Sequence, residues 1–172
     1  MQAVKRLFIT FLAFSSLFGL SVPAAHSAAA WTATVESVGD GDSFKARRKG
    51  RSVRVRLYGI DSPEFRQHYG YQARQLARQL LPKGREIEVY PMDRDHYGRV
   101  VALVRSGGIL VNREMVRQGA AWVYPRYCRE RTFCAELKAA QDQARSARLG
   151  LWQDARPEAP WEWKRRQPQK GR

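Results

Sequence analysis

Acidic side chains are scarce in this chain of 172 residues. It has 16 Asp and Glu against 31 Lys and Arg, which gives a formal net charge of +15. This excess of positive charge indicates a polyanionic partner, which charge alone leaves open as nucleic acid, an anionic membrane surface or an acidic polysaccharide. Because 44% of the residues are apolar, the chain can bury a core, which excludes a disordered protein.

Cysteine and histidine are also rare, with two cysteines and three histidines. Cys128 and Cys134 have no histidine nearby, and their spacing does not match a zinc-binding pattern. We therefore favour a disulfide between them over a metal site, provided that the chain is exported to an oxidising compartment. His68 and His96 have no nucleophilic partner in the sequence, and we expect both to face solvent.

Long apolar runs are missing as well. The N-terminal stretch 7–20 has 14 residues behind the basic Lys5 and Arg6, whereas a transmembrane helix needs about 20 apolar residues. Small residues in 23–30 offer cleavage sites, so we predict a signal peptide over 1–29 and a secreted or periplasmic protein. We expect a monomer without stable membrane association after signal removal, because no long basic amphipathic helix is present.

The rest of the chain alternates between strand-like and helix-like patterns. A meander with a hairpin tip at 49–51 is followed by one helix, two more strands and two helices. The expected strands are 31–38, 43–48, 52–57, 85–92 and 99–110, and the expected helices are 69–81, 112–119 and 135–150. Asn112 is expected to cap the second helix. This order predicts an α+β protein with an OB-fold, a five-stranded β-barrel with three helices, over 30–155. We expect the basic C-terminal tail, 156–172, to be mostly extended, and docking of Trp161 and Trp163 on the domain stays open.

Six of the 16 acids lie in three stretches that also contain or adjoin arginine. The stretches are "GDGDSFKA" (39–46), "RLYGIDSPEFRQ" (56–67) and "DRDHYGR" (93–99). Each has a simple alternative explanation, because Asp and Gly are common in turns and a surface ion pair contributes only about 0–1 kcal/mol. Alternation along 52–57 places Arg54 and Arg56 on one face, opposite Val53, Val55 and Leu57.

Several motifs in the same order resemble the staphylococcal nuclease family. They are "DGDS" (40–43), "RLYGIDSPE" (56–64), "YG" before a helical alanine (69–73), "DHYGR" (95–99), "VNREMVRQGAAWVY" (111–124) and "ARLGLW" (147–152). The resemblance spans about 31–152. It implies a calcium-dependent phosphodiesterase that cuts DNA and RNA and leaves 3′-phosphate ends.

The resemblance also implies roles for individual residues. Asp42 and Asp61 would bind Ca²⁺ through carboxylates and Ser62 through its backbone carbonyl, with Asp40 behind them. Glu64 would position or deprotonate the attacking water, while Arg56 and Arg99 would hold the phosphate. Tyr97 would lie near the phosphate or base, and either Tyr124 or Tyr127 would stack on a base.

The chemistry of these side chains agrees with such roles. Ca²⁺ prefers oxygen ligands, and planar, permanently charged arginines suit a phosphoryl group. The alternative is an OB-fold module that binds nucleic acid without cleaving it. The presence of both the acids and the arginines favours the enzyme.

Overall fold

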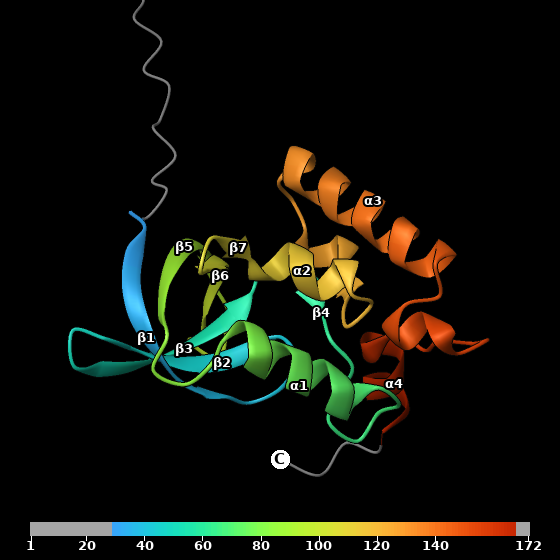
Figure 1. Ribbon diagram of the computed structural model, residues 1–172, viewed down its shortest axis with the longest axis horizontal. Coiled ribbons are helices and arrows are strands. Elements are labelled where there is room, and N and C mark those ends of the chain that lie inside the picture. Colours follow the sequence, from blue (N-terminus) through green and yellow to red (C-terminus); the bar gives the residue numbers. More distant parts are fainter. Residues whose placement is uncertain (1–28, 168–172) are drawn as a thin grey trace, which may run out of the picture.

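A computed structural model of the protein describes residues 29–167 (Figure 1). The predicted signal peptide, 1–29, therefore lies outside the described residues except for its last position. The described part contains a β-barrel, α-helices that pack against it, and a C-terminal helix that lies beside the segment leading into the first helix.

Five strands form the barrel. They are β1 (Trp31–Val38), β2 (Ser43–Arg48), β3 (Arg51–Leu57), β5 (Glu86–Arg94) and β6 (Val100–Ser106). Neighbours follow the order β3-β2-β1-β5-β6, and a parallel pairing of β3 with β6 closes the sheet. The predicted OB-fold is thus confirmed, and closure leaves these strands without a free pairing edge between β3 and β6.

Alternation of buried and exposed side chains explains the strands. Val55 in β3 and Val104 in β6 are fully buried, whereas Arg54 is exposed and Arg56 only partly so. A half-buried strand requires this period of two, because successive side chains point to opposite faces. The expected hairpin tip is also present, since Lys49 and Gly50 both adopt positive φ angles, of 47° and 77°.

Three short strands lie beside the barrel. β7 (Ile109–Leu110) extends its sheet at β6, and β4 (Ile60–Asp61) and β8 (Trp122–Val123) pair antiparallel to form a separate two-stranded sheet. The pairing of β4 with β8 fixes the chain that follows β3 against a segment some sixty residues later. It therefore determines where Asp61 lies.

Four α-helices occur within residues 29–167, one more than predicted. They are α1 (Gly70–Leu80), α2 (Val111–Arg117), α3 (Arg131–Ser146) and α4 (Pro160–Arg166), with 3₁₀ turns η1 (Pro125–Tyr127) and η2 (Gly150–Gln153). The expectation of an extended tail is wrong for α4, where Pro160 begins a helix, as proline often does at the first helical position. No helix among these residues is long and apolar enough to cross a membrane.

Asn112 does not cap α2. The cap position is Leu110, and Asn112 is completely buried one residue inside the helix. Its side-chain carbonyl accepts from the Val104 amide at 2.9 Å, and its amide nitrogen donates to the carbonyls of Tyr58 (3.0 Å) and Ala102 (3.1 Å). Asn112 therefore connects α2, β6 and the end of β3, which is a contact that a local capping rule does not anticipate.

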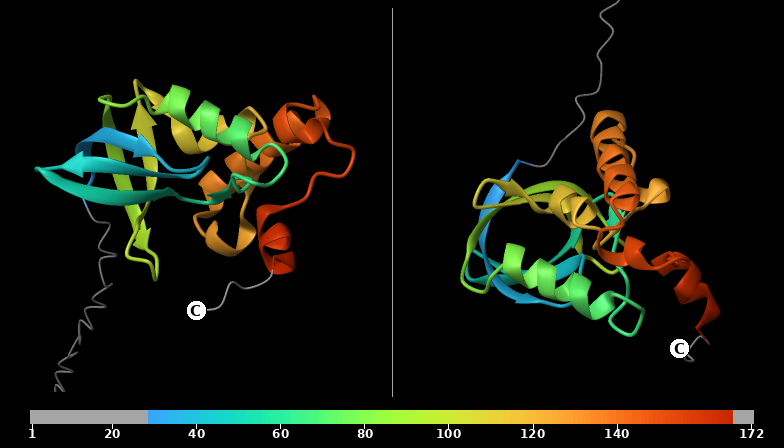
Figure 2. Two further views of the ribbon diagram at one scale, coloured as in Figure 1. Left: turned by 90° about the horizontal axis from the view of Figure 1, so that it is seen from below. Right: turned by 45° about the vertical axis from the view of Figure 1, so that its right-hand side comes forward.

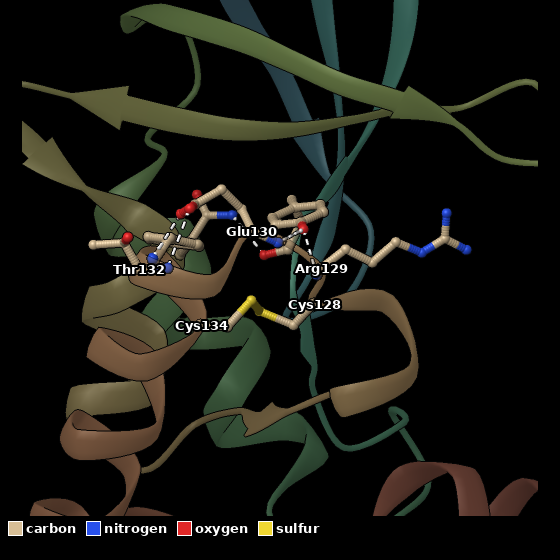
Figure 3. The surroundings of a disulfide bond; sticks show 8 residues. Cys128, Arg129, Glu130, Thr132 and Cys134 are labelled. Atoms are coloured by element: carbon tan, nitrogen blue, oxygen red, sulfur yellow. Dashed lines mark hydrogen bonds between the residues drawn. A yellow bond between two sulfur atoms is a disulfide. The ribbon is translucent and has the colours of Figure 1, made fainter.

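Cys128 and Cys134 form the predicted disulfide at the start of α3 (Figure 3). The loop that it closes wraps over Tyr58, whose hydroxyl accepts from the backbone amides of Arg129 (2.6 Å) and Glu130 (3.0 Å). The Glu130 side chain caps α3 by accepting from the Phe133 amide at 2.6 Å, so the helix begins four residues earlier than predicted. The disulfide thus supports the chain next to β4.

Candidate active site

Three charged side chains form a cluster that we call the buried cluster: Asp42, Arg56 and Asp61. One guanidinium nitrogen of Arg56 donates to Asp42 Oδ1 at 2.9 Å and another to Asp61 Oδ1 at 2.7 Å. Both carboxylate side chains are at most 4% exposed, and that of Arg56 is 18% exposed. The two acid stretches read from the sequence at 39–46 and 56–67 are therefore one site.

Backbone contacts hold the cluster together. The Asp42 carbonyl accepts from the Leu57 amide at 2.8 Å, and Asp42 Oδ2 accepts from the Ser62 amide at 2.8 Å. Asp40 Oδ1 accepts from the Asp42 amide at 3.2 Å, so Asp40 lies next to the cluster, and its role behind the calcium ligands stays a prediction. A Cβ atom at Gly41 would lie 2.6 Å from the Ser62 side chain, so only glycine allows the two loops to approach this closely.

Burial dominates the electrostatics of the cluster. Desolvation raises the pKa of Asp42 well above its usual value, and repulsion from Asp40 and Asp61 adds to this effect against the attraction of Arg56. Desolvation works against the charge of Arg56, but attraction to Asp42 and Asp61 outweighs it and raises the pKa of Arg56. Carboxylates crowded in this way gain from a further positive charge.

Glu64 and Lys164 lie at the exposed edge of the buried cluster. The ammonium of Lys164, which comes from α4, lies 2.8 Å from Glu64 Oε1 and 3.3 Å from Asp61 Oδ1. Desolvation opposes the charge of Lys164, yet attraction to Asp61 and Glu64 raises its pKa. The Glu64 side chain is 36% exposed, which leaves it open to water.

Arg99 belongs to a separate group that we call the turn cluster, which consists of Asp95 and Arg99. Arg99 Nε donates to Asp95 Oδ2 at 2.6 Å, and the Arg99 amide donates to Asp95 Oδ1 at 2.9 Å. Partial burial pushes the pKa of Asp95 up, but the hydrogen bonds from Arg99 and from the Tyr97 amide lower it below its usual value. In the described residues, Arg99 makes no ion pair with the buried cluster.

The strand pairing nevertheless brings Arg99 and Arg56 to the same face of the barrel. Val55 pairs with Val100 on the inner face, so Arg56, which follows Val55 on β3, and Arg99, which directly precedes β6, point away from that face. Tyr97 is 60% exposed, and the Arg99 guanidinium lies 5.4 Å from its ring centre. Arg54 donates to the Tyr97 carbonyl and joins the turn to β3.

Aromatic rings lie beside the acidic centre, on the segment after β8. Tyr124 contacts Tyr127 edge-on, with ring centres 4.8 Å apart, and stacks on Trp161 of α4 at 4.8 Å with an interplanar angle of 4°. Trp122 contacts Trp152, which is 4% exposed and belongs to the core. Of the two tyrosines expected to stack on a base, Tyr124 therefore has a flat face that is already covered.

The donor atoms of the site suit a hard divalent cation. Asp42 and Asp61 offer carboxylate oxygens, and Ser62 Oγ is buried without a hydrogen-bond partner in the part of the chain that the structure describes. The Lys164 ammonium already occupies a cation position between Asp61 and Glu64. No group of three or more His, Cys, Asp or Glu within 29–167 is arranged to hold a metal, so the calcium ligands stay a prediction.

Comparison with known proteins agrees with this fold. Residues 54–154 match the family described as staphylococcal nuclease homologue. The chain is 39% identical over 128 residues to an uncharacterized endonuclease of Escherichia coli, which covers 74% of this chain and 80% of that protein. It is 35% identical over 135 residues to a micrococcal nuclease of Shigella flexneri, across 73% of this chain and 76% of the relative.

A plant relative shows the same domain in a longer protein. A probable staphylococcal-like nuclease of Oryza sativa subsp. japonica is 38% identical over 115 residues, which is 67% of this chain but 33% of that protein. The closed barrel with its acid and arginine centre thus defines a nuclease of the OB-fold class. The chain belongs to the staphylococcal nuclease family.

Sequence reasoning missed Lys164 at this site, and it named Trp161 as a residue that could dock on the domain without assigning it to this surface. Both lie beyond residue 154, where the family match ends. The only local signal was the pair of tryptophans in an otherwise polar tail, because isolated large aromatics in such a segment often dock on a domain. Which surface they cover follows only from the fold.

Proposed function

We propose that the protein is an exported, calcium-dependent nuclease that hydrolyses phosphodiester bonds of DNA and RNA and leaves 3′-phosphate ends. The observation that supports this most directly is the buried cluster, in which Arg56 bridges Asp42 and Asp61 at 2.9 and 2.7 Å. Charges are expensive to bury, and a protein that only binds nucleic acid needs basic and aromatic surface rather than buried acids.

Each residue of the site has a proposed role. Asp42 and Asp61 would hold Ca²⁺ through their carboxylates and Ser62 through its carbonyl. Bound there, the ion would supply Lewis-acid stabilisation of the phosphate charge. Glu64 is the partly exposed carboxylate, and it would accept a proton from the attacking water as the 5′ oxygen leaves.

The arginines would bind the phosphate. A guanidinium has five N–H donors, and the hydrogen bonds from Arg56 to Asp42 and Asp61 use two of its nitrogens, which leaves donors for a phosphate. Arg99 has its Nε on Asp95, and this bond orients the side chain while its terminal nitrogens stay available. Planar donors of this kind match phosphate oxygens in pairs.

Other features of the proposal rest on the sequence. The N-terminal segment would direct export to a periplasm or to the medium, and the cleaved protein would act as a monomer. The net charge of +15 suits long nucleic acids, because each neutralised phosphate releases counterions. Tyr97, which is exposed beside Arg99, and Tyr124 or Tyr127 would contact the bases.

The test measures cleavage of plasmid DNA and of RNA with Ca²⁺, with Mg²⁺ and with excess chelator. Calcium should support cleavage and chelation should abolish it. Glu64→Gln should keep the fold and lower the turnover number by roughly 10²-fold or more, because it removes the general base. Glu136→Gln, an exposed acid on α3, is the matched control and should cleave at the parental rate.

Two outcomes would contradict the proposal. Full activity in excess chelator would remove calcium from it, and parental activity of a folded Glu64→Gln protein would remove Glu64 as the base. If the parent protein binds DNA but cleaves neither nucleic acid at any calcium concentration, the non-catalytic binding module replaces the nuclease.

A further inference from the structure

The C-terminal helix α4 covers the candidate active site. Figure 1 shows α4 next to the segment that leads into α1, and the right-hand view of Figure 2 shows the same neighbourhood. The Gln67 side chain in that segment donates to the carbonyl of Glu158, two residues before α4, at 2.7 Å. The family match does not include α4, because this helix begins six residues after the last matched residue.

Lys164 contacts the same carboxylates that the nuclease proposal assigns to calcium binding and to water activation. Its ammonium lies 2.8 Å from Glu64 Oε1, and 3.3 and 3.5 Å from the two oxygens of Asp61. A divalent cation and this ammonium cannot both lie between Asp61 and Glu64 at such distances. The lysine therefore acts as a tethered monovalent competitor for the cation position.

Trp161 covers a second feature of the site. Its ring is parallel to that of Tyr124 within 4° at a centre distance of 4.8 Å, and it contacts Trp122 edge-on at 5.8 Å. A parallel, flat aromatic ring at this separation is also how a nucleobase stacks on a tyrosine. One turn of α4 thus presents an aromatic ring and a cation with the spacing i, i+3, which places both on one side of the helix.

The attachment of α4 is weak enough to be reversible. The helix has seven residues, which is too short to be stable without the surface on which it packs. The Lys164 side chain stays 42% exposed, and Pro160 is the buried residue of the helix. A short segment held by partly exposed contacts opens more readily than the barrel core.

We infer that α4 is an autoinhibitory strap, in which Lys164 occupies the cation position at Asp61 and Glu64 while Trp161 occupies the stacking face of Tyr124. Calcium and a nucleic acid strand displace the strap together, because each competes with one of its two contacts. This inference depends on the proposed nuclease function. The closed strap lowers the apparent affinity for calcium, which equals the intrinsic affinity multiplied by the fraction of molecules that are open.

The first experiment measures calcium binding by titration calorimetry in the absence of nucleic acid, so that no activity is involved. Lys164→Met should bind Ca²⁺ about two- to fivefold more tightly than the parent, the change expected from removing a partly exposed ion pair. Arg165→Met removes the same charge from the next position, where the side chain is 76% exposed, and should leave the affinity unchanged. Lys164→Gln replaces the Met variant if the latter fails to show the parental thermal transition.

The second experiment uses a short single-stranded oligodeoxynucleotide in the presence of chelator, which prevents cleavage. Trp161→Ala should bind the oligonucleotide more tightly than the parent. Trp163→Ala, which changes a residue on the opposite side of α4, should not. Equal calcium affinity of the Lys164 variant and the parent would overturn the strap, as would weaker oligonucleotide binding by Trp161→Ala, which would make Trp161 a substrate contact. A parent that binds no calcium would instead overturn the proposed function.

Discussion

The buried cluster and the turn cluster have the same ingredients and different structural roles. In both, an arginine binds an aspartate at under 3 Å. The buried cluster collects its members from the turn before β2, from β3 and from β4, whereas the turn cluster joins Asp95 to Arg99 four residues later. The first depends on the closed barrel, and the second forms within one turn.

The difference shows how burial changes the value of an ion pair. An exposed pair contributes little, because water screens it and solvates each partner if the pair breaks. When a buried charge loses its partner, no water takes the place of that partner. Breaking a buried pair is therefore costly, even where forming the pair gains little. We therefore expect the two clusters to respond differently to equivalent substitutions.

The largest effect is expected for Arg56→Met. This change leaves Asp42 and Asp61 without the guanidinium that bridges them, and we expect a loss of about 3–5 kcal/mol in the free energy of unfolding. Urea denaturation measures it, with Arg54→Met on the same strand as the exposed control. A loss no greater than that of the control would show that the buried cluster does not depend on Arg56.

A smaller effect is expected for Arg99→Lys, and it should appear in activity rather than in stability. Lysine keeps the charge but not the planar pair of donors, so kcat/KM should fall by roughly 10- to 10²-fold. The free energy of unfolding should change by less than about 1 kcal/mol, because lysine keeps the charge opposite Asp95, which is partly buried at 16% exposed. Parental cleavage by this variant would exclude Arg99 from phosphate binding.

The smallest effect is expected for Asp95→Asn, and it depends on pH. The folded-state pKa of Asp95 is lowered, so the carboxylate stabilises the protein above its unfolded-state pKa, and this stabilisation is lost as pH falls through the folded-state pKa. The variant should lose less than about 1 kcal/mol at neutral pH, and its stability should fall less steeply than that of the parent below about pH 4. Thermal unfolding across pH measures this, with Asp93→Asn as the control. Parallel pH profiles for parent and variant would contradict it.

Local rules explain which parts of the fold were predictable. The alternation in β3 and the hairpin tip at Lys49 and Gly50 follow from side-chain direction and from the φ angles that a tight turn needs. The disulfide was predictable because the chain is expected to be exported to an oxidising compartment and has two cysteines. The rules failed at Asn112 and at 160–166, because both positions are decided by neighbours distant in the sequence: Asn112 bonds Tyr58 from 54 residues away, and α4 packs on Tyr124.

The sequence by itself determined the barrel, the family and which charged residues are candidates for the site, because periodic patterns and motifs consist of residues that are close together in the chain. Only the tertiary structure decided that Asp42 and Asp61 share Arg56, that Arg99 binds Asp95 instead, and that Lys164 reaches Asp61 across 103 residues. Charges attract over short distances in space without regard to sequence separation. Chain closure and the docking of α4 therefore set which of the many possible pairs form.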